Sequence, residues 1–361
     1  MRKISKHSGS NSILIRTIAV IICLLISSVL SSKKNEYTLN IKPTKWKNNK
    51  SAAVSITFDD GYSCQFTKGI SLLSERHFFG TFFLITGNVN KNVGGVNWDI
   101  VRKAALLGHE IGSHTVHHAD LTKLINNVRG LDSLRKEVVN SQLTINQQVC
   151  TQKCLSFCYP WNKGDIRIEN IISNYYICAC TSGSYENDVN NLYEINRVTI
   201  KSKSKLSEMN KWVDNVINEN GWLVECIHGI DSGGWQPVPY NVYDQHFSYL
   251  KEKESFLWVA TVQDIVKYTK ERQSFMIYDE IVTNKNITFY LTDFLPDDIY
   301  NYPLTITMNL PAKFETVYQA KQNNRPLPNK IIFSGTNRIL LIDGIIPNGG
   351  KVIISLKKAM T

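Results

Sequence analysis

The chain has 361 residues, of which 43% are hydrophobic and 20% are charged, and its net charge is +10. This balance excludes a disordered chain, a collagen-like repeat and a polytopic membrane protein, and the size predicts about two domains. The positive charge is uneven: residues 1–50 carry ten basic residues against the single acid Glu36, which leaves +1 for residues 51–361. A nearly neutral body lacks the basic stripe that follows phosphates, which argues against a nucleic-acid partner.

An apolar run of 14 residues, Thr17–Leu30, follows a basic N-terminal segment. A helix needs about 20 residues to cross a bilayer, so this run suits the hydrophobic part of a cleaved signal peptide. We therefore expect residues 1–31 to direct the protein out of the cytosol, to be secreted or held at the cell surface or in the periplasm. The alternative is a membrane anchor formed by residues 13–30. Residues 32–50 are expected to be a basic, solvated linker.

Eight cysteines are present, and Cys23 lies in the apolar run. Seven remain, so at least one thiol stays free or pairs with another chain. The spacing of Cys150, Cys154 and Cys158 differs from that of structural zinc sites. Disulfides near Cys150 and Cys154 are one interpretation, and small buried thiols are the other.

From Ser51 onward, short apolar runs alternate with amphipathic stretches. Strands are predicted at residues 52–58, 80–86, 110–114, 155–159, 176–179, 222–227 and 256–261. Helices are predicted at residues 67–75, 98–107, 121–148 and 262–272. Such alternation is typical of an α/β fold with a parallel sheet, closed or doubly wound.

The pattern changes after about residue 274. Short β-rich runs are separated by turn-forming residues, at 287–291, 304–310, 315–320, 338–342 and 351–356. Several short strands without helices predict a small antiparallel sandwich. The domains expected are therefore a catalytic unit at 51–274 and an accessory β-rich unit at 275–361.

Two adjacent carboxylates, Asp59 and Asp60, stand at the end of the first predicted strand and precede Gly61. In parallel α/β folds, ligands bind beyond the carboxyl ends of the strands. A helix N-cap is the alternative role for such an aspartate.

Three of the eight histidines fall within residues 114–118, again just after a predicted strand. His114 and His118 are four residues apart, which suits two ligands of one metal, whereas His117 does not share their face. Two imidazoles and one carboxylate leave coordination positions open for water or substrate, as in a hydrolytic zinc site.

Two further motifs follow strands, namely Pro160-Trp161 and Ile227-His228-Gly229. Together with residues 57–61 (TFDDG) and 113–118 (SHTVHH), they resemble the polysaccharide deacetylases, which share the NodB homology domain of carbohydrate esterase family 4. The resemblance covers roughly residues 50–272. It implies a distorted (β/α) barrel that removes acetyl groups from sugar polymers with one divalent metal, most often Zn²⁺, with Co²⁺ or Ni²⁺ as alternatives.

The resemblance also implies roles for individual residues. Asp59 would be the general base and His228 the general acid, and the metal ligands would be Asp60, His114 and His118. The backbone N–H of Trp161 would help to stabilise the oxyanion.

The sequence departs from the family pattern at Cys158, where many relatives carry an arginine that orients the catalytic aspartate. Another arginine could take over, and Arg197 is a candidate, although an arginine in the sequence is more often an ordinary surface residue. No acidic partner for His228 can be located. Tyr62, Trp161 and Trp235 are candidates for stacking against a sugar ring.

We therefore expect a secreted metal-dependent N-deacetylase, a hydrolase of carbon–nitrogen bonds other than peptide bonds. Its substrate would be a glycan containing N-acetylglucosamine, such as chitin-like polymer or peptidoglycan. An O-deacetylase of the acetylxylan type and a catalytically weak carbohydrate-binding protein are the alternatives. No obligate protein partner is inferred. The protein would contact a membrane only if its N-terminal segment is retained.

Overall fold

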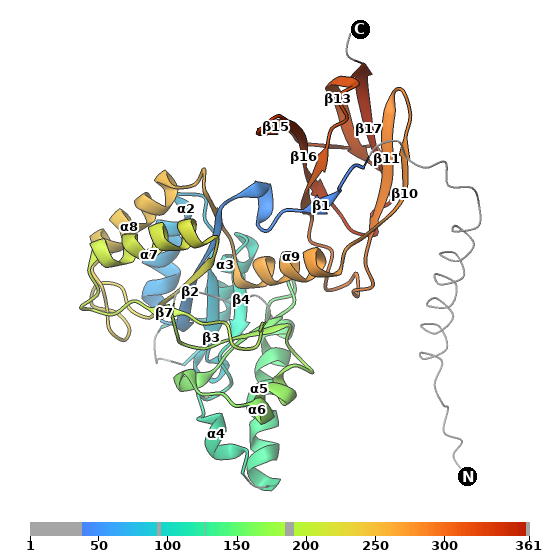
Figure 1. Cartoon of the computed structure of the whole chain (residues 1–361). Coiled ribbons are helices and arrows are strands. Elements are labelled where there is room, and N and C mark those ends of the chain that lie inside the picture. The colour runs from blue at the N-terminus through green and yellow to red at the C-terminus, as the bar shows by residue number, and fades with distance from the viewer. Residues whose placement is uncertain (1–37, 92–94, 127, 185–190, 359–361) are drawn as a thin grey trace, which may run out of the picture.

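The computed structural model describes residues 38–91, 95–126, 128–184 and 191–358 (Figure 1). The predicted signal peptide and Cys23 lie outside the described residues. The chain forms a lobe of parallel strands surrounded by helices and a second lobe of antiparallel strands, with α9 running between them. None of the helices in these ranges is long and apolar enough to cross a membrane.

The first lobe is built on a curled parallel sheet with β2 near its centre. Its strands follow the order β6-β5-β4-β3-β2-β8-β7, and β9 pairs with the first residues of β2. Eight of the nine residues of β2 are buried, because the strand is covered on both faces. The distorted (β/α) barrel that the sequence predicts is therefore confirmed. The strands are β2 Ala52–Asp60, β3 Thr81–Leu84, β4 Glu110–Ser113, β5 Ser156–Cys158, β6 Cys178–Cys180, β7 Val198–Thr199, β8 Trp222–Ile227 and β9 Leu257–Val259.

Helices cover the outside of this sheet. The predicted helix at 121–148 is two helices, and three helices, α6, α7 and α8, were not predicted. In α7 the buried residues Met209, Val213 and Val216 share one face, so the helical pattern was present but is diluted by polar residues. The helical segments are η2 Gln65–Gly69, α2 Ile70–Ser74, η3 Thr86–Asn88, α3 Trp98–Leu106, α4 Leu121–Leu124, α5 Val128–Gln148, η4 Pro160–Asn162, α6 Ile166–Ile172, α7 Leu206–Glu219, α8 Tyr240–Glu252 and α9 Val262–Ser274.

The second lobe contains two antiparallel sheets, in the orders β1-β12-β16-β15 and β10-β11-β17-β13-β14. Alternate residues of β11 and β17 face a common core, as in Ile287, Phe289 and Leu291 of β11. The prediction of an antiparallel sandwich is therefore confirmed. Its strands are β1 Lys42–Pro43, β10 Met276–Val282, β11 Asn286–Thr292, β12 Leu304–Asn309, β13 Phe314–Gln322, β14 Arg325–Leu327, β15 Asn329–Ser334, β16 Asn337–Ile345 and β17 Lys351–Lys358.

The prediction of a solvated linker is wrong for residues 38–50. β1 pairs with β12, so this segment is the edge of a sheet in the second lobe. Leu39 and Ile41 are buried in the sandwich core, whereas Asn40 and Lys42 between and after them are exposed. The lysines dominate the composition of this segment, but the alternate apolar residues determine where it packs.

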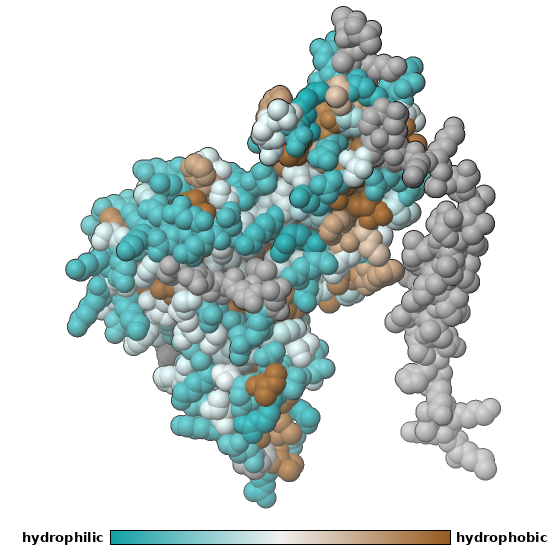
Figure 2. All heavy atoms as spheres, viewed as in Figure 1, coloured by the Kyte–Doolittle hydropathy of each residue, from teal (hydrophilic) through white to brown (hydrophobic). Residues whose placement is uncertain are grey.

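The surface that Figure 2 shows is largely hydrophilic, and its hydrophobic residues are spread over both lobes. Single exposed apolar side chains of this kind are usual in folded proteins.

Two carboxyl groups meet where α9 contacts the second lobe. Glu271 is fully buried, and its carboxyl group is in hydrogen-bonding contact with that of Asp293. Glu271 Oε1 accepts a hydrogen bond from Tyr302 N (3.2 Å) and Asp293 Oδ1 accepts one from Leu295 N (2.7 Å). The other oxygens, Glu271 Oε2 and Asp293 Oδ2, are buried without a donor among the described residues. Burial, and then the Asp293 carboxyl, raise the pKa of Glu271 to about 9.

This contact predicts a loss of stability as the pH rises from the acid range to about 9. Folded protein keeps Glu271 protonated up to pH about 9, whereas the unfolded chain releases this proton near the ordinary glutamate value of about 4.3. The free energy of unfolding should therefore fall as the pH rises between these two values. In Glu271→Gln, an amide donor replaces the proton, so its melting temperature should fall less than that of the wild type between pH 5 and pH 9. Circular dichroism melts would measure this, with the exposed Glu252→Gln as control. Parallel curves for wild type and Glu271→Gln would contradict the prediction.

Candidate active site

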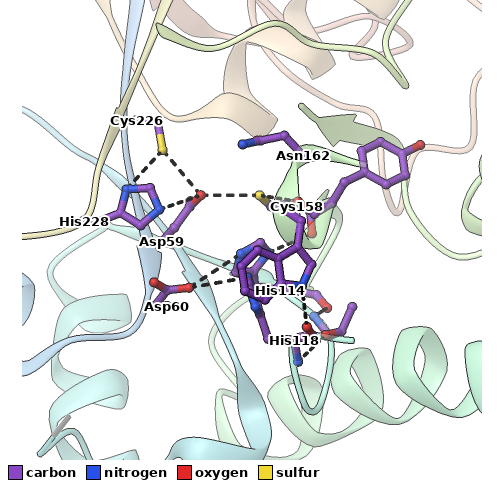
Figure 3. A network of polar contacts seen from close by, with 12 residues as sticks. Asp59, Asp60, His114, His118, Cys158, Asn162, Cys226 and His228 are labelled. Carbon is purple, nitrogen blue, oxygen red and sulfur yellow. Dashed lines mark hydrogen bonds and ion pairs between the residues drawn. The ribbon is translucent and has the colours of Figure 1, made fainter. Parts of the chain in front are cut away.

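The carboxyl ends of the parallel strands bring together the segments that the sequence singles out (Figure 3). Asp59 and Asp60 end β2, His114 and His118 follow β4, and His228 follows β8. All five residues line one pocket with a volume of about 570 Å³. The other residues that line this pocket are Tyr62, Ile85, Asn88, Tyr159, Trp161, Asn162, Ser182, Thr199, Lys201 and Trp235.

Asp60, His114 and His118 form a group in which each residue can offer one ligand atom to the same ion. His114 Nε2 lies 3.7 Å and His118 Nε2 lies 3.8 Å from Asp60 Oδ1. Zinc binds nitrogen and oxygen ligands at about 2.0–2.2 Å, so these separations can span one ion. The residues that the resemblance implies as metal ligands therefore lie together.

The hydrogen bonding of His114 fits a ligand role. Its Nδ1 lies 2.8 Å from the backbone carbonyl oxygen of Cys158, so Nδ1 carries the proton and donates it. The lone pair of Nε2 then faces Asp60, which is the arrangement that second partners of metal-binding histidines usually impose. Burial lowers the pKa of His114 to about 3, so the ring is a neutral donor at ordinary pH. One carboxylate and two neutral imidazoles are a donor set that suits a divalent ion.

The turn that carries His118 has an unusual backbone. Thr115 and His118 have φ values of 66° and 59°, in the left-handed region. Such conformations cost about 1–3 kcal/mol each and persist only where the surroundings enforce them. Here Thr115 Oγ1 accepts a hydrogen bond from His118 N (2.9 Å), and Gly87 approaches so closely that an added Cβ would lie 2.5 Å from Val116 O.

Asp59 is held by a two-pronged contact with Arg197. Arg197 Nη1 lies 2.7 Å from Asp59 Oδ1, and Arg197 Nη2 lies 2.8 Å from Asp59 Oδ2. Both side chains are almost fully buried. Burial raises the pKa of the Asp59 carboxyl, but the Arg197 guanidinium outweighs it and holds the pKa well below its ordinary value. Asp59 is therefore an ionised carboxylate in fixed orientation, and Arg197 lies where the sequence analysis expected an orienting residue.

Cys158, at which the sequence departs from the pattern of the family that it resembles, is part of the same cluster. Arg197 Nη2 lies 2.9 Å from its Sγ, and Asp59 Oδ2 is 3.6 Å from this Sγ and 3.4 Å from Cys226 Sγ. Burial raises the pKa of both thiols well above the ordinary value, so they remain protonated and can donate to Asp59. The small side chain at position 158 leaves room for the guanidinium of Arg197.

Disulfides near Cys150 and Cys154 do not occur in the structure. Cys150 is exposed, Cys154 is buried, and all seven cysteines in the described ranges are free thiols. Six of them are buried, which agrees with the alternative interpretation of small core residues.

His228 faces Asp59 from the end of β8. Its Nε2 lies 3.9 Å from Asp59 Oδ2, and its Nδ1 lies 3.8 Å from Cys226 Sγ. Within the described part of the chain, Asp59 is the only carboxylate within 4 Å of this ring. Among the described residues, His228 has no acidic partner besides Asp59, and the Cys226 thiol lies beside its Nδ1.

The three aromatic candidates all lie at the pocket. The Trp161 ring is 4.7 Å from the His118 ring, and the Trp235 ring is 4.8 Å from the His228 ring, measured between centroids. Trp161 is 61% exposed and Trp235 is 48% exposed, so each presents an open face beside a site histidine. Tyr62 hydrogen bonds with the Asp60 carboxyl. Trp161 also has a left-handed backbone, with φ 60°.

Gln65 is a site residue that the sequence analysis missed. It is fully buried, and its Nε2 donates to Asp59 O (2.6 Å) and to His228 O (2.8 Å). One amide therefore ties the ends of β2 and β8 together. A glutamine within an otherwise apolar face was the only signal in the sequence.

Residues 47–177 match the family model described as polysaccharide deacetylase. The chain is 25% identical over 338 residues to a Bacillus protein named gellan lyase, in a match that covers 86% of this chain and 13% of that protein. It is 34% identical over 97 residues to a peptidoglycan-N-acetylglucosamine deacetylase of Bacillus cereus, covering 27% of this chain and 32% of the relative. With a peptidoglycan-N-acetylmuramic acid deacetylase of Bacillus subtilis, the identity is 35% over 94 residues, covering 25% and 34%.

The chain spans about a third or less of the length of these relatives. The region matched by the family model includes β2 to β5 and carries Asp59, Asp60, His114 and His118. Within the α/β lobe, residues 47–177 thus match the polysaccharide deacetylase family, which is the family that the sequence motifs resemble.

Proposed function

We propose that the chain is a metal-dependent polysaccharide deacetylase that hydrolyses the N-acetyl groups of a glycan containing N-acetylglucosamine and releases acetate. The observation that carries this proposal is the convergence of Asp60, His114 and His118 beside a second, ionised carboxylate, Asp59. A binding protein needs no second carboxylate held by a buried arginine, whereas a hydrolase needs a base next to its metal.

Asp60, His114 and His118 would hold one divalent ion, Zn²⁺ in the first instance, with Co²⁺ or Ni²⁺ as substitutes. Such an ion polarises a carbonyl group and makes water a better nucleophile near neutral pH, which an acetamide requires because it is a poor electrophile.

The remaining steps belong to groups of the protein itself. Asp59 is ionised and accepts the proton of the attacking water. The backbone N–H of Trp161 donates a hydrogen bond to the acetyl oxygen as negative charge develops there. His228 donates a proton to the departing amine, because an amine cannot leave as an anion.

Aromatic rings on both sides of the site support a sugar substrate. Trp161 and Trp235 present open faces next to His118 and His228, and a pyranose ring can stack on such faces. Two relatives are named as deacetylases of peptidoglycan sugars, which favours peptidoglycan or a chitin-like polymer as substrate. We further propose that residues 1–31 direct secretion of the protein.

Metal analysis gives the first test. Purified protein should carry about one divalent ion per chain, because three ligands converge on a single position. Chelation should abolish acetate release, and added Zn²⁺ or Co²⁺ should restore it. His114→Ala should lose metal and activity together, as measured by elemental analysis and by an acetate assay.

Substitution of Asp59 separates catalysis from metal binding. Asp59→Asn keeps the shape of the side chain but cannot accept a proton, so acetate release should fall about 10²- to 10⁴-fold while the metal content is retained. Chitin oligomers, peptidoglycan and acetylxylan are the substrates to compare. Wild-type protein that binds one of these glycans but frees no acetate with Zn²⁺ or Co²⁺ supplied would instead be a carbohydrate-binding protein. Release from acetylxylan alone would identify an O-deacetylase.

Arg197 should affect both stability and activity. Arg197→Met leaves the Asp59 carboxylate buried without its cation, a change that typically costs about 3–5 kcal/mol. Urea unfolding should show this loss, and acetate release should fall with it. Arg197→Lys keeps the charge but not the two-pronged contact, so its stability and its acetate release should lie between those of the wild type and Arg197→Met. The matched control is Arg135→Met, because Arg135 and Asp132 are more than half exposed and such pairs contribute about 0–1 kcal/mol. Equal effects of Arg197→Met and Arg135→Met would contradict the prediction.

A further inference from the structure

The turn between the two site histidines has a partner on helix α5. Val116 N and His117 N donate to Glu137 Oε2, at 3.0 Å and 2.8 Å. His117 Nδ1 lies 2.6 Å from the other oxygen, Glu137 Oε1. A single carboxylate therefore receives three donors from two consecutive residues that stand between His114 and His118.

Glu137 is a charged residue on a buried helix face, where residues with only a packing role are usually apolar. It is 8% exposed and lies on the buried face of α5, among Leu134, Val138, Ser141 and Ile145. In the described part of the chain, neither Lys nor Arg lies within 4 Å of its carboxylate; its one titratable neighbour is His117. A buried carboxylate is stable only when hydrogen bonds replace its water, and here the turn supplies these bonds.

A second residue of the same helix face reaches the same turn. Ser141, one helical turn after Glu137, lies 2.8 Å from Ser113 Oγ, and Ser113 Oγ accepts a hydrogen bond from Thr115 N (3.3 Å). On the opposite side, Gly87 N donates to Val116 O (2.8 Å). The turn is thus clamped between α5 and η3, and it is the segment in which Thr115 and His118 adopt left-handed backbones.

We propose that Glu137 is a positioning residue for the metal site, which fixes the turn at residues 115–118 through Val116 and His117 so that His118 faces Asp60 beside His114. This inference rests on the proposed function, since it concerns how that site holds its ion. It also gives a role to His117, which is not among the residues that line the pocket and is 68% exposed at its side chain. His117 is not a ligand but a donor to the residue that holds the turn.

The matched variants differ in which hydrogen bonds position 137 can make. Glu137→Met keeps the length of the side chain but removes both acceptor oxygens, so the affinity for Zn²⁺ should fall about 10- to 100-fold, as is typical when partners behind metal ligands are lost. Glu137→Gln should stay close to the wild type. Its amide oxygen can accept from both N–H groups, and its NH₂ can donate to the other tautomer of His117.

Two measurements would read this out without relying on activity. Zn²⁺ affinity would be measured by competition with a chromophoric chelator. The visible absorption of the Co²⁺-loaded protein would report the ligand geometry, which should change in Glu137→Met and be restored in Glu137→Gln.

Ile145→Ala is the control for a purely structural effect. Ile145 is fully buried on the same helix, two turns beyond Glu137, so its truncation should lower stability without changing Zn²⁺ affinity. If Glu137→Met does not fold, His117→Ala serves in its place. The His117 side chain is exposed, and its truncation removes only the contact between His117 Nδ1 and Glu137 Oε1. This variant should weaken Zn²⁺ binding less than the loss of both Glu137 oxygens would.

The outcomes separate this inference from the proposed function. If the wild type does not bind Zn²⁺, or if it binds Zn²⁺ equally well after His114→Ala, the metal site itself is overturned. If the wild type binds Zn²⁺ and Glu137→Met has the same Zn²⁺ affinity and the same Co²⁺ spectrum, the role of Glu137 alone is overturned. If Glu137→Met does not fold, the same comparison is made with His117→Ala. A Zn²⁺ affinity that falls as much in Ile145→Ala as in Glu137→Met would also overturn the role of Glu137.

Discussion

The arrangement of the site depends on two adjacent carboxylates, Asp59 and Asp60, at the end of the central strand β2. Neighbouring carboxylates in a low-dielectric site cannot both stay ionised unless each is compensated. Asp59 is compensated from one direction, by the guanidinium of Arg197 and by two thiols. Asp60 has a left-handed backbone, with φ 75°, and faces His114 and His118. These imidazoles are neutral, so burial, and then the Asp59 charge, raise the pKa of Asp60 to about 6. The separation of the two environments lets adjacent residues hold different roles.

This separation draws distant parts of the chain to one place. Arg197 precedes β7 at the edge of the sheet, yet its side chain lies against Asp59 on the central strand β2. It can do so because Cys158 is small and because Thr57 Oγ1, 3.1 Å from Arg197 Nη1, provides a further hydrogen-bonding partner. A buried ion pair of this kind gives little net stability, because both charges lose their water. Its value lies in the fixed orientation of the Asp59 carboxylate.

Sequence reasoning succeeded where one local rule decides the outcome. Residues at the carboxyl ends of parallel strands must share an edge, so Asp59, His114 and His228 could be grouped before any coordinates were known. Arg197 was named only as a candidate replacement for the arginine that Cys158 lacks, and its contact with Asp59 came from the structure. The rule failed where partners come from other elements. Glu137 and Gln65 were missed because a polar residue on a buried face shows only that it has a partner, and the partner depends on packing. Residues 38–50 were misjudged because their lysines hid the alternation of Leu39 and Ile41.

The edge strand β1 joins a segment that precedes the α/β lobe to the sandwich that follows it. Residues 42 and 43 precede the whole α/β lobe, yet they pair with β12, which follows it. During synthesis on the ribosome, this strand must wait unpaired until more than 250 further residues have emerged, as the pairing of Lys42 with Thr307 requires. The sandwich is therefore not an interchangeable module that begins after α9. A cut at that point would remove an edge strand and leave Leu39 and Ile41 without the core that buries them.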